Sequence, residues 1–138
     1  MIFYLRLPAL LSAAALLTSC ATTISVRDCA PGEERAIVDS LYFGTNMPGG
    51  QVGRDDWQSF LATVITPRFP KGVTTWSASG QWQRASGHIE KEGSYVLQVV
   101  HPDSRQADKD LEEIVSLYKK RFRQEAVLRI RNSACVSL

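Results

Sequence analysis

Few side chains in this sequence could act as metal ligands or nucleophiles. The chain has three cysteines and two histidines. A zinc site requires three or four His, Cys or carboxylate ligands at recognisable spacing, and no such spacing surrounds His88 or His101. The sequence also contains no Gly-x-Ser-x-Gly elbow and no Gly-x-x-x-x-Gly-Lys-Ser/Thr phosphate loop. We therefore expect no metal and no cofactor, and an enzyme is the less favoured class.

Cys20 ends a segment that is typical of an export signal. Arg6 precedes an apolar run from Leu7 to Leu17, and a short positive region before about 7–15 apolar residues describes a secretory signal peptide. Residues 17–20, Leu-Thr-Ser-Cys, resemble a bacterial lipobox, which implies cleavage before Cys20 and attachment of lipid to its sulfur. The alternative is an ordinary signal peptide in which this cysteine is incidental.

A lipidated Cys20 predicts both the localisation and the first partner of the chain. The protein would be anchored in the bacterial cell envelope, with the membrane as its partner. Ala21 follows the cysteine, and because no Asp signals retention in the inner membrane, the outer membrane is favoured, with the domain facing the periplasm. Residues 1–19 are then the signal peptide. Residues 20–34 are the lipidated cysteine and a tether without apolar period, and residues 35–138 are the domain.

Composition excludes several classes of protein. The 138 residues include 16 Lys+Arg and 14 Asp+Glu, a formal charge of +2, and 44% are hydrophobic. These values are ordinary for a globular chain and exclude disorder, collagen and long coiled coils. The length allows one domain. The near-neutral charge argues against nucleic acid as a partner, because such binding needs a clustered excess of Lys and Arg.

Hydrophobic periodicity predicts two helices and four strands. Apolar residues recur at helical spacing after Gly53, up to the residue before Pro67, and again after Ser104. Strand patterns cover residues 36–43, 73–83, 95–101 and 126–131. The order β-α-β-β-α-β predicts an α+β fold of the ferredoxin-like type. With its four strands numbered along the chain, this fold has an antiparallel sheet of order 4-1-3-2 and both helices on one face.

Several short motifs together resemble a known family of small bacterial lipoproteins, the domain of unknown function 3574. The resemblance covers roughly residues 40–138. It supports the domain limits and implies no catalytic activity. The motifs are Leu41-Tyr42-Phe43-Gly44, Thr66-Pro67-Arg68-Phe69-Pro70, Gly80-Gln81-Trp82, His101-Pro102, and Gln124-Glu125 through Arg129.

The sheet face away from the helices is the candidate site for a ligand or partner. If Leu41 and Phe43 point toward the helices, the alternate side chains of that strand point outward. Hydroxyls, amides, one aromatic ring and one fixed cation suit a small polar or anionic ligand. Alternatives are a plain solvated face and a homodimer packed sheet to sheet. The residues expected on this face are Ser40, Tyr42, Ser77, Ser79, Gln81, Gln98 and Arg129, with Arg68 and Glu125 adding charge from nearby helix ends.

Apolar faces also contain the three tryptophans, Trp57, Trp76 and Trp82. We expect them to pack in the core and not to stack on a carbohydrate. On the edge strand at residues 126–131, Arg129 and Arg131 are expected to point outward.

These observations favour a membrane-anchored, non-enzymatic binding or interaction module of the bacterial envelope. Its open sheet face would meet a protein partner or a second copy. The alternative is a small ferredoxin-like enzyme, of the isomerase or oxygenase type, that uses the same face. Tyr42, His101 and Arg129 would then supply acid–base chemistry and hold an anion.

Cys29 and Cys135 are predicted to form a disulfide. Lipidation of Cys20 leaves them as an even pair in an exported protein, where disulfides persist. Cys29 precedes the first predicted strand and Cys135 follows the last. In the order 4-1-3-2 these strands are antiparallel neighbours, so the two cysteines would lie at the same end of the sheet. The alternative is two separate thiols.

Overall fold

The computed structural model describes residues 29–137. The predicted signal peptide, Cys20 and the first part of the tether lie outside the described residues. Within the described range, no helix is both long enough and apolar enough to cross a membrane.

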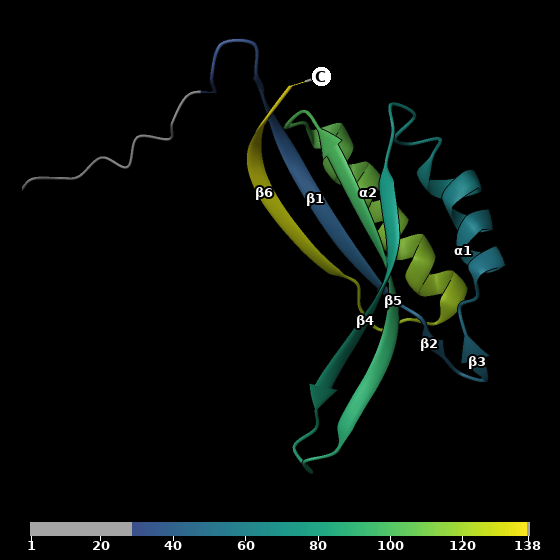
Figure 1. Ribbon diagram of the computed structural model, residues 1–138. Coiled ribbons are helices and arrows are strands. Elements are labelled where there is room, and N and C mark those ends of the chain that lie inside the picture. Colours follow the sequence, from purple (N-terminus) through teal and green to yellow (C-terminus); the bar gives the residue numbers. More distant parts are fainter. Residues whose placement is uncertain (1–28, 138) are drawn as a thin grey trace, which may run out of the picture.

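Four strands form one antiparallel sheet: β1 (Glu34–Gly44), β4 (Thr74–Gln83), β5 (Ile89–His101) and β6 (Leu128–Val136). They are hydrogen-bonded in the order β4-β5-β1-β6. Between β1 and the first helix lies a separate hairpin of β2 (Asn46–Met47) and β3 (Gly50–Gln51). β5 begins before the predicted residue 95, so β4 and β5 form a long hairpin that projects beyond the helices (Figure 1).

Both predicted helices are present and cover the same sheet face (Figure 1). α1 (Arg54–Phe60) continues into a π-helical turn at Leu61–Ile65, in which Thr66 N donates to Leu61 O at 2.9 Å. α2 spans Arg105–Phe122, and the side chain of Ser104 caps it by accepting from Ala107 N at 3.2 Å. The α+β class, with a four-stranded antiparallel sheet and two helices, is confirmed.

The core lies between this sheet face and the two helices. Its central part is aromatic: the ring centroid of Phe43 on β1 lies 5.3 Å from that of Trp57 and 4.6 Å from that of Tyr118. Trp57 also stacks on Tyr95 of β5 at 4.8 Å. Burial raises the pKa of the Tyr118 hydroxyl, which donates to Gly44 O at 2.9 Å. The aliphatic part of the core includes Leu41, Leu97, Val99, Leu111 and Ile114.

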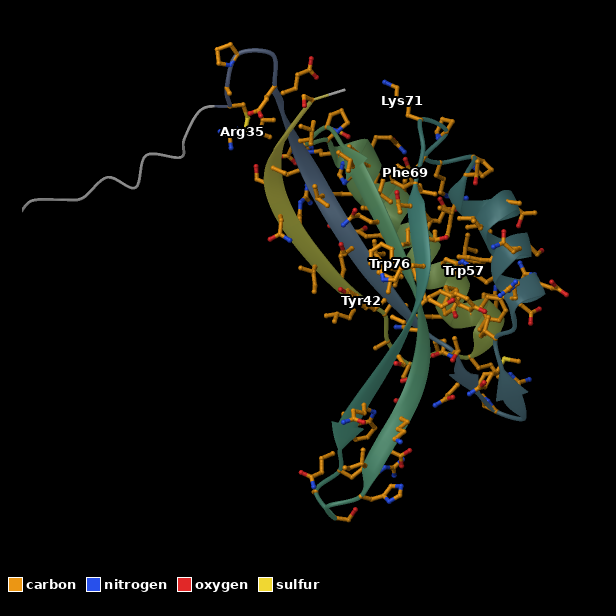
Figure 2. All side chains as sticks on the ribbon, viewed as in Figure 1. Arg35, Tyr42, Trp57, Phe69, Lys71 and Trp76 are labelled. Carbon is orange, nitrogen blue, oxygen red and sulfur yellow. A yellow bond between two sulfur atoms is a disulfide. The ribbon has the colours of Figure 1, made fainter. Side chains whose placement is uncertain are left out.

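Of the three tryptophans, only Trp57 is in the core. It is 2% exposed, whereas Trp76 is 43% and Trp82 54% exposed, so the prediction that all three are buried is wrong. On β4, Trp76 pairs with Val96 and Ser77 pairs with Tyr95. Because Tyr95 contacts Trp57 on the helix side, Trp76 points to the opposite, open face (Figure 2). Alternation shows which residues share a face of a strand, but not which face the helices cover.

The two arginines of β6 are also on the opposite face from the one predicted. Arg129 pairs with Leu41, and Arg131 pairs with Asp39. Both partners have no exposed surface and lie on the helix side, so the arginines point toward the helices. Their neighbours Leu128 and Ile130 occupy the open face instead.

The predicted disulfide is confirmed. Cys29 and Cys135 are bonded, with their Cα atoms 5.5 Å apart across 106 residues of sequence. The bond joins the chain just before β1 to the C-terminal end of β6, where Cys135 pairs with Arg35 of β1. It therefore closes the end of the sheet at which the domain begins.

Trp57→Ala is predicted to lower the free energy of unfolding by about 3–5 kcal/mol, because it leaves a large cavity among four other aromatic rings. Urea unfolding followed by far-UV circular dichroism measures the change. Trp82→Ala is the matched control and should cost less than about 1 kcal/mol, since that ring is largely exposed. Equal costs for the two variants would contradict the described core.

Candidate functional site

A buried carboxylate lies on β1, one of the two inner strands of the sheet. Asp39 of β1 has no exposed surface. Arg129 of β6 donates to it twice, from Nε to Oδ1 at 2.7 Å and from Nη2 to Oδ2 at 2.9 Å. His101 Nε2 of β5 lies 2.8 Å from Oδ2. One carboxylate therefore binds side chains from both neighbouring strands.

The contacts continue from Arg129 to α2. Its Nη2 donates to Asp108 Oδ1 at 2.8 Å, and Arg131 binds the same oxygen. Arg131 Nη2 also donates to Asp103 at 2.9 Å, just before the helix. The cluster thus joins three strands to the start of α2.

The charges in this cluster stabilise one another. Burial by itself raises the pKa of Asp39, but the hydrogen bonds from Arg129 and His101 more than offset this and hold the pKa below its ordinary value of 3.8. The hydrogen bond from Arg129 likewise lowers the pKa of Asp108. His101 Nδ1 lies 2.8 Å from Pro102 O, so both ring nitrogens face oxygens that accept. Both contacts are hydrogen bonds when the ring carries two protons.

The buried polar atoms of the cluster are all paired within the protein. Among the described residues, no buried side-chain nitrogen or oxygen lacks a hydrogen-bond partner. A shallow depression of about 210 Å³ does border His101, but both ring nitrogens are already engaged. We conclude that the Asp39 cluster stabilises the fold.

The residues proposed for catalysis do not lie together. Tyr42 points to the open face, opposite Val96 and Leu128. His101 and Arg129 meet at Asp39 on the helix side. The predicted set of Tyr42, His101 and Arg129 is therefore divided between the two faces of the sheet.

Only part of the predicted ligand face is on the open side. Ser40, Tyr42 and Gln98 lie there, and Gln98 Nε2 donates to Ser40 Oγ at 3.5 Å. Arg68 lies on the helix side and pairs with Glu113 of α2 at 2.9 Å. The prediction that Ser77, Ser79 and Gln81 of β4 face the open side is wrong. They pair with Tyr95, Gly93 and Lys91, and their side chains therefore lie on the same face of the β4–β5 pair as Tyr95, which is the helix side.

The open face carries most of the exposed large hydrophobic side chains, a property that sequence reasoning missed. Among the described residues, five of the six exposed large hydrophobic side chains belong to it: Trp76, Trp82, Val100, Leu128 and Ile130. The signal was present in the sequence, because tryptophans alternate with Ser and Gln along β4, and Leu and Ile alternate with arginines along β6.

Three consecutive rows of side chains across the open face contain no charge, and we call them the uncharged rows. Strand pairing places them side by side from β4 to β6. The first is Trp76, Val96, Tyr42 and Leu128; the second is Thr74, Gln98, Ser40 and Ile130; the third is Val100, Val38 and Asn132.

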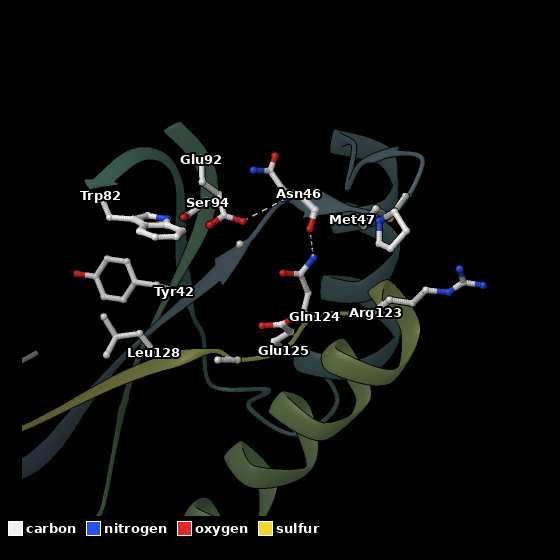
Figure 3. Close-up of a pocket in the computed structure, with 13 residues that line it drawn as sticks. Tyr42, Asn46, Met47, Trp82, Glu92, Ser94, Arg123, Gln124, Glu125 and Leu128 are labelled. Atoms are coloured by element: carbon white, nitrogen blue, oxygen red, sulfur yellow. Dashed lines mark hydrogen bonds between the residues drawn. The ribbon is translucent and has the colours of Figure 1, made fainter. Parts of the chain in front are cut away.

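A groove of about 740 Å³ adjoins the first row, where the sheet meets the β2–β3 hairpin and the end of α2 (Figure 3). Tyr42, Trp82 and Leu128 form one wall. The polar lining includes Glu125, which was predicted to add charge, and Glu92, which was not singled out. Gln124 Nε2 donates to Asn46 O at 2.6 Å and ties the hairpin to the end of α2.

The Asp39 cluster predicts a specific loss of stability in acid. A carboxyl whose pKa is lowered by folding stabilises the protein fully above its ordinary value, and this contribution is lost as the pH falls below about 3.8. Asp39→Asn should cost about 3 kcal/mol at neutral pH and should flatten the decline of unfolding free energy between pH 4 and 2. Asp55→Asn, on the exposed surface of α1, is the control and should keep the decline. Urea titrations across this pH range test the prediction, and an unchanged slope in Asp39→Asn would contradict it.

Comparisons with known proteins concern the family and the fold. The family model described as "Protein of unknown function (DUF3574)" matches residues 38–138. The comparison with curated proteins found no match. Among solved structures, a phage SAM lyase in complex with S-methyl-5′-thioadenosine is similar with a TM-score of 0.53 and 13% identity, over 82% of this chain and 95% of that one. A phage SAM lyase in the apo state gives 0.51 and 12%, over 83% and 97%.

At these identities the likeness to the lyase concerns the fold alone. The family match is of a different kind, because it covers most of the chain and contains β1 from Val38 onward, both helices and the other three strands of the sheet. The chain therefore belongs to the DUF3574 family.

Proposed function

We propose that this chain is a lipid-anchored, non-enzymatic interaction module of the bacterial cell envelope whose open sheet face packs against a second copy. The observation that carries the proposal is the set of uncharged rows. Soluble monomers rarely expose a contiguous apolar surface of this kind. Here the uncharged rows carry four exposed large hydrophobic side chains, from Trp76 of β4 to Leu128 of β6, interleaved with polar ones such as Gln98 and Ser40.

A second copy fits this surface for two reasons. Because the rows contain no charge, two such faces can meet without placing like charges opposite each other. Gln98 and Ser40 lie in the middle row and offer both donors and acceptors. Two copies related by a twofold axis can therefore pair these groups reciprocally.

The proposed topology is ferredoxin-like. When the four strands of the sheet are numbered among themselves, the order from β6 to β4 is 4-1-3-2. One helix lies between the first and second of these strands and the other between the third and fourth. This connectivity supports the assignment and leaves the open face available for assembly.

The proposed address is the outer membrane, with the domain facing the periplasm. It rests on the lipobox-like residues that end at Cys20. It also rests on Ala21, because an Asp that would signal retention in the inner membrane does not follow the cysteine. The Cys29–Cys135 disulfide supports export, because disulfides persist in oxidising compartments. The enzyme alternative built on Tyr42, His101 and Arg129 receives no support from a set that is divided between two faces.

The dimer is tested by placing a charge in the second uncharged row. Wild-type protein is expected to sediment as a dimer at high micromolar concentration, and Ile130→Glu as a folded monomer, because each dimer would bury two unpaired carboxylates. Ile89→Glu is the matched control: Ile89 is 51% exposed but pairs with Gln83 on the other side of the hairpin, so this variant should remain dimeric. A monomeric wild type, or a dimeric Ile130→Glu, would overturn the proposal.

Anchoring is tested at Cys20. Wild-type protein should take up radioactive palmitate and fractionate with membranes, whereas Cys20→Ser should remain unlabelled and soluble. The double variant Cys29→Ser/Cys135→Ser is the control for loss of cysteine and should keep the label. Unlabelled wild-type protein would remove the anchor from the proposal.

A further inference from the structure

We propose that the groove beside the first uncharged row binds a small organic cation that carries ammonium groups. The groove shares Tyr42 and Leu128 with the first uncharged row, whereas the rest of its lining lies outside the uncharged rows. It requires neither the lipid anchor nor the second copy.

The shape of the groove suits an organic ligand. Its volume is about 740 Å³, within the range of roughly 300–1,000 Å³ for small-molecule sites. Figure 3 shows the rings of Tyr42 and Trp82 above Leu128 along one wall, with polar side chains facing them. An aliphatic chain can therefore lie along this wall while its polar groups reach the opposite side.

The charge of the groove selects a cation. Glu92 and Glu125 line it, and Figure 3 shows Arg123, the one cationic side chain of the lining, extending away from both. Glu92 accepts a hydrogen bond from Asn46 N at 3.4 Å. Across residues 29–137, none of the ion pairs involves Glu92 or Glu125. Both carboxylates therefore lack a cationic partner within the described chain.

The aromatic wall adds a second source of attraction. Tryptophan is the aromatic side chain that best attracts a cation to its ring face, and tyrosine does so as well. The guanidinium of Arg84 lies 5.4 Å from the Trp82 centroid, so this ring already contacts one cation. Arg84 does not line the groove, which leaves the wall toward Tyr42 for a ligand.

The donor set fits an ammonium group better than a bare metal ion. Calcium takes six to eight oxygen ligands, and such sites bring several carboxylates together. The one described cluster of three potential metal-ligating side chains is Cys29, Glu33 and Cys135, where both sulfurs are in the disulfide. Glu92 and Glu125 belong to no such cluster, and separate carboxylates can each accept hydrogen bonds from one ammonium group. A diamine is thus the simplest ligand that engages both.

The groove is held in shape before any ligand arrives. Thr45 Oγ1 donates to Gly93 O at 2.9 Å and fixes the chain after β1 against β5. The Gln124–Asn46 hydrogen bond fixes the hairpin against the end of α2. A preformed site loses less conformational entropy on binding.

Isothermal titration calorimetry with 1,5-diaminopentane tests the site on the mature protein. Wild type should bind the diamine and should not bind glutarate, which has similar length and the opposite charge. Glu92→Gln/Glu125→Gln should weaken binding by at least about tenfold, and Trp82→Leu by several-fold. Glu113→Gln is the control for loss of a carboxylate outside the groove, because Glu113 pairs with Arg68 on the helix side, and it should bind as wild type does.

Two further measurements make the result specific. Ile130→Glu should bind the diamine as wild type does, so a failed dimer and a failed ligand site are distinguishable. Nα-acetyl-lysine amide, which presents one ammonium on a peptide unit, should bind more weakly than the diamine; tighter binding would overturn the assignment to a small molecule. The proposal is also overturned if wild type shows no binding of the diamine, if glutarate binds equally well, or if the double variant binds unchanged.

Discussion

The carboxylate of Asp39 lies in the middle of the sheet with no exposed surface, and its charge has to be matched inside the protein. An unpaired buried charge costs several kcal/mol, so the structure must bring cations to this position. Arg129 reaches it from β6 and His101 reaches it from β5. Because side chains alternate along a strand, an inward Arg129 requires that its two neighbours face outward. One buried acid therefore determines which residues of β6 form the open face.

This dependence explains what could be predicted from the sequence and what could not. The helical stripe that contains Trp57 and the cysteine pair were predicted correctly, because local periodicity and a count of cysteines are sufficient for them. The faces of β4 and β6 were not, since a period of two assigns residues to faces without saying which face is covered. Charge alone suggests that Arg129 lies outside, and only the long-range contact with Asp39 reverses this. The sequence did contain a hint, because Asp39 alternates in step with the apolar residues Leu41 and Phe43 and so shares their face of the strand.

Because side chains alternate between the two faces of the sheet, the ion pairs that stabilise the fold lie on one face and the candidate binding surface lies on the other. Ion pairs of Asp39, Asp108 and the β6 arginines lie between the sheet and α2, where they fix the geometry. Uncharged side chains fill the central rows of the other face, and carboxylates appear only toward its ends. The candidate site changes accordingly: the hydroxyl- and amide-rich face expected from sequence becomes an uncharged surface with exposed apolar side chains, and a negatively charged groove that contains Glu92 and Glu125 lies at its hairpin end.

The position of the disulfide has a mechanical consequence. Cys29 is the point at which the chain enters the described domain, and the bond connects it directly to β6. A pull on the chain ahead of this residue is therefore shared between two strands, and it cannot peel β1 from the sheet while β6 stays behind. Since β1 pairs with both β5 and β6, separating the first strand would require the simultaneous loss of several rows of hydrogen bonds. A domain held at this end by the proposed anchor would thus resist unravelling from its point of attachment.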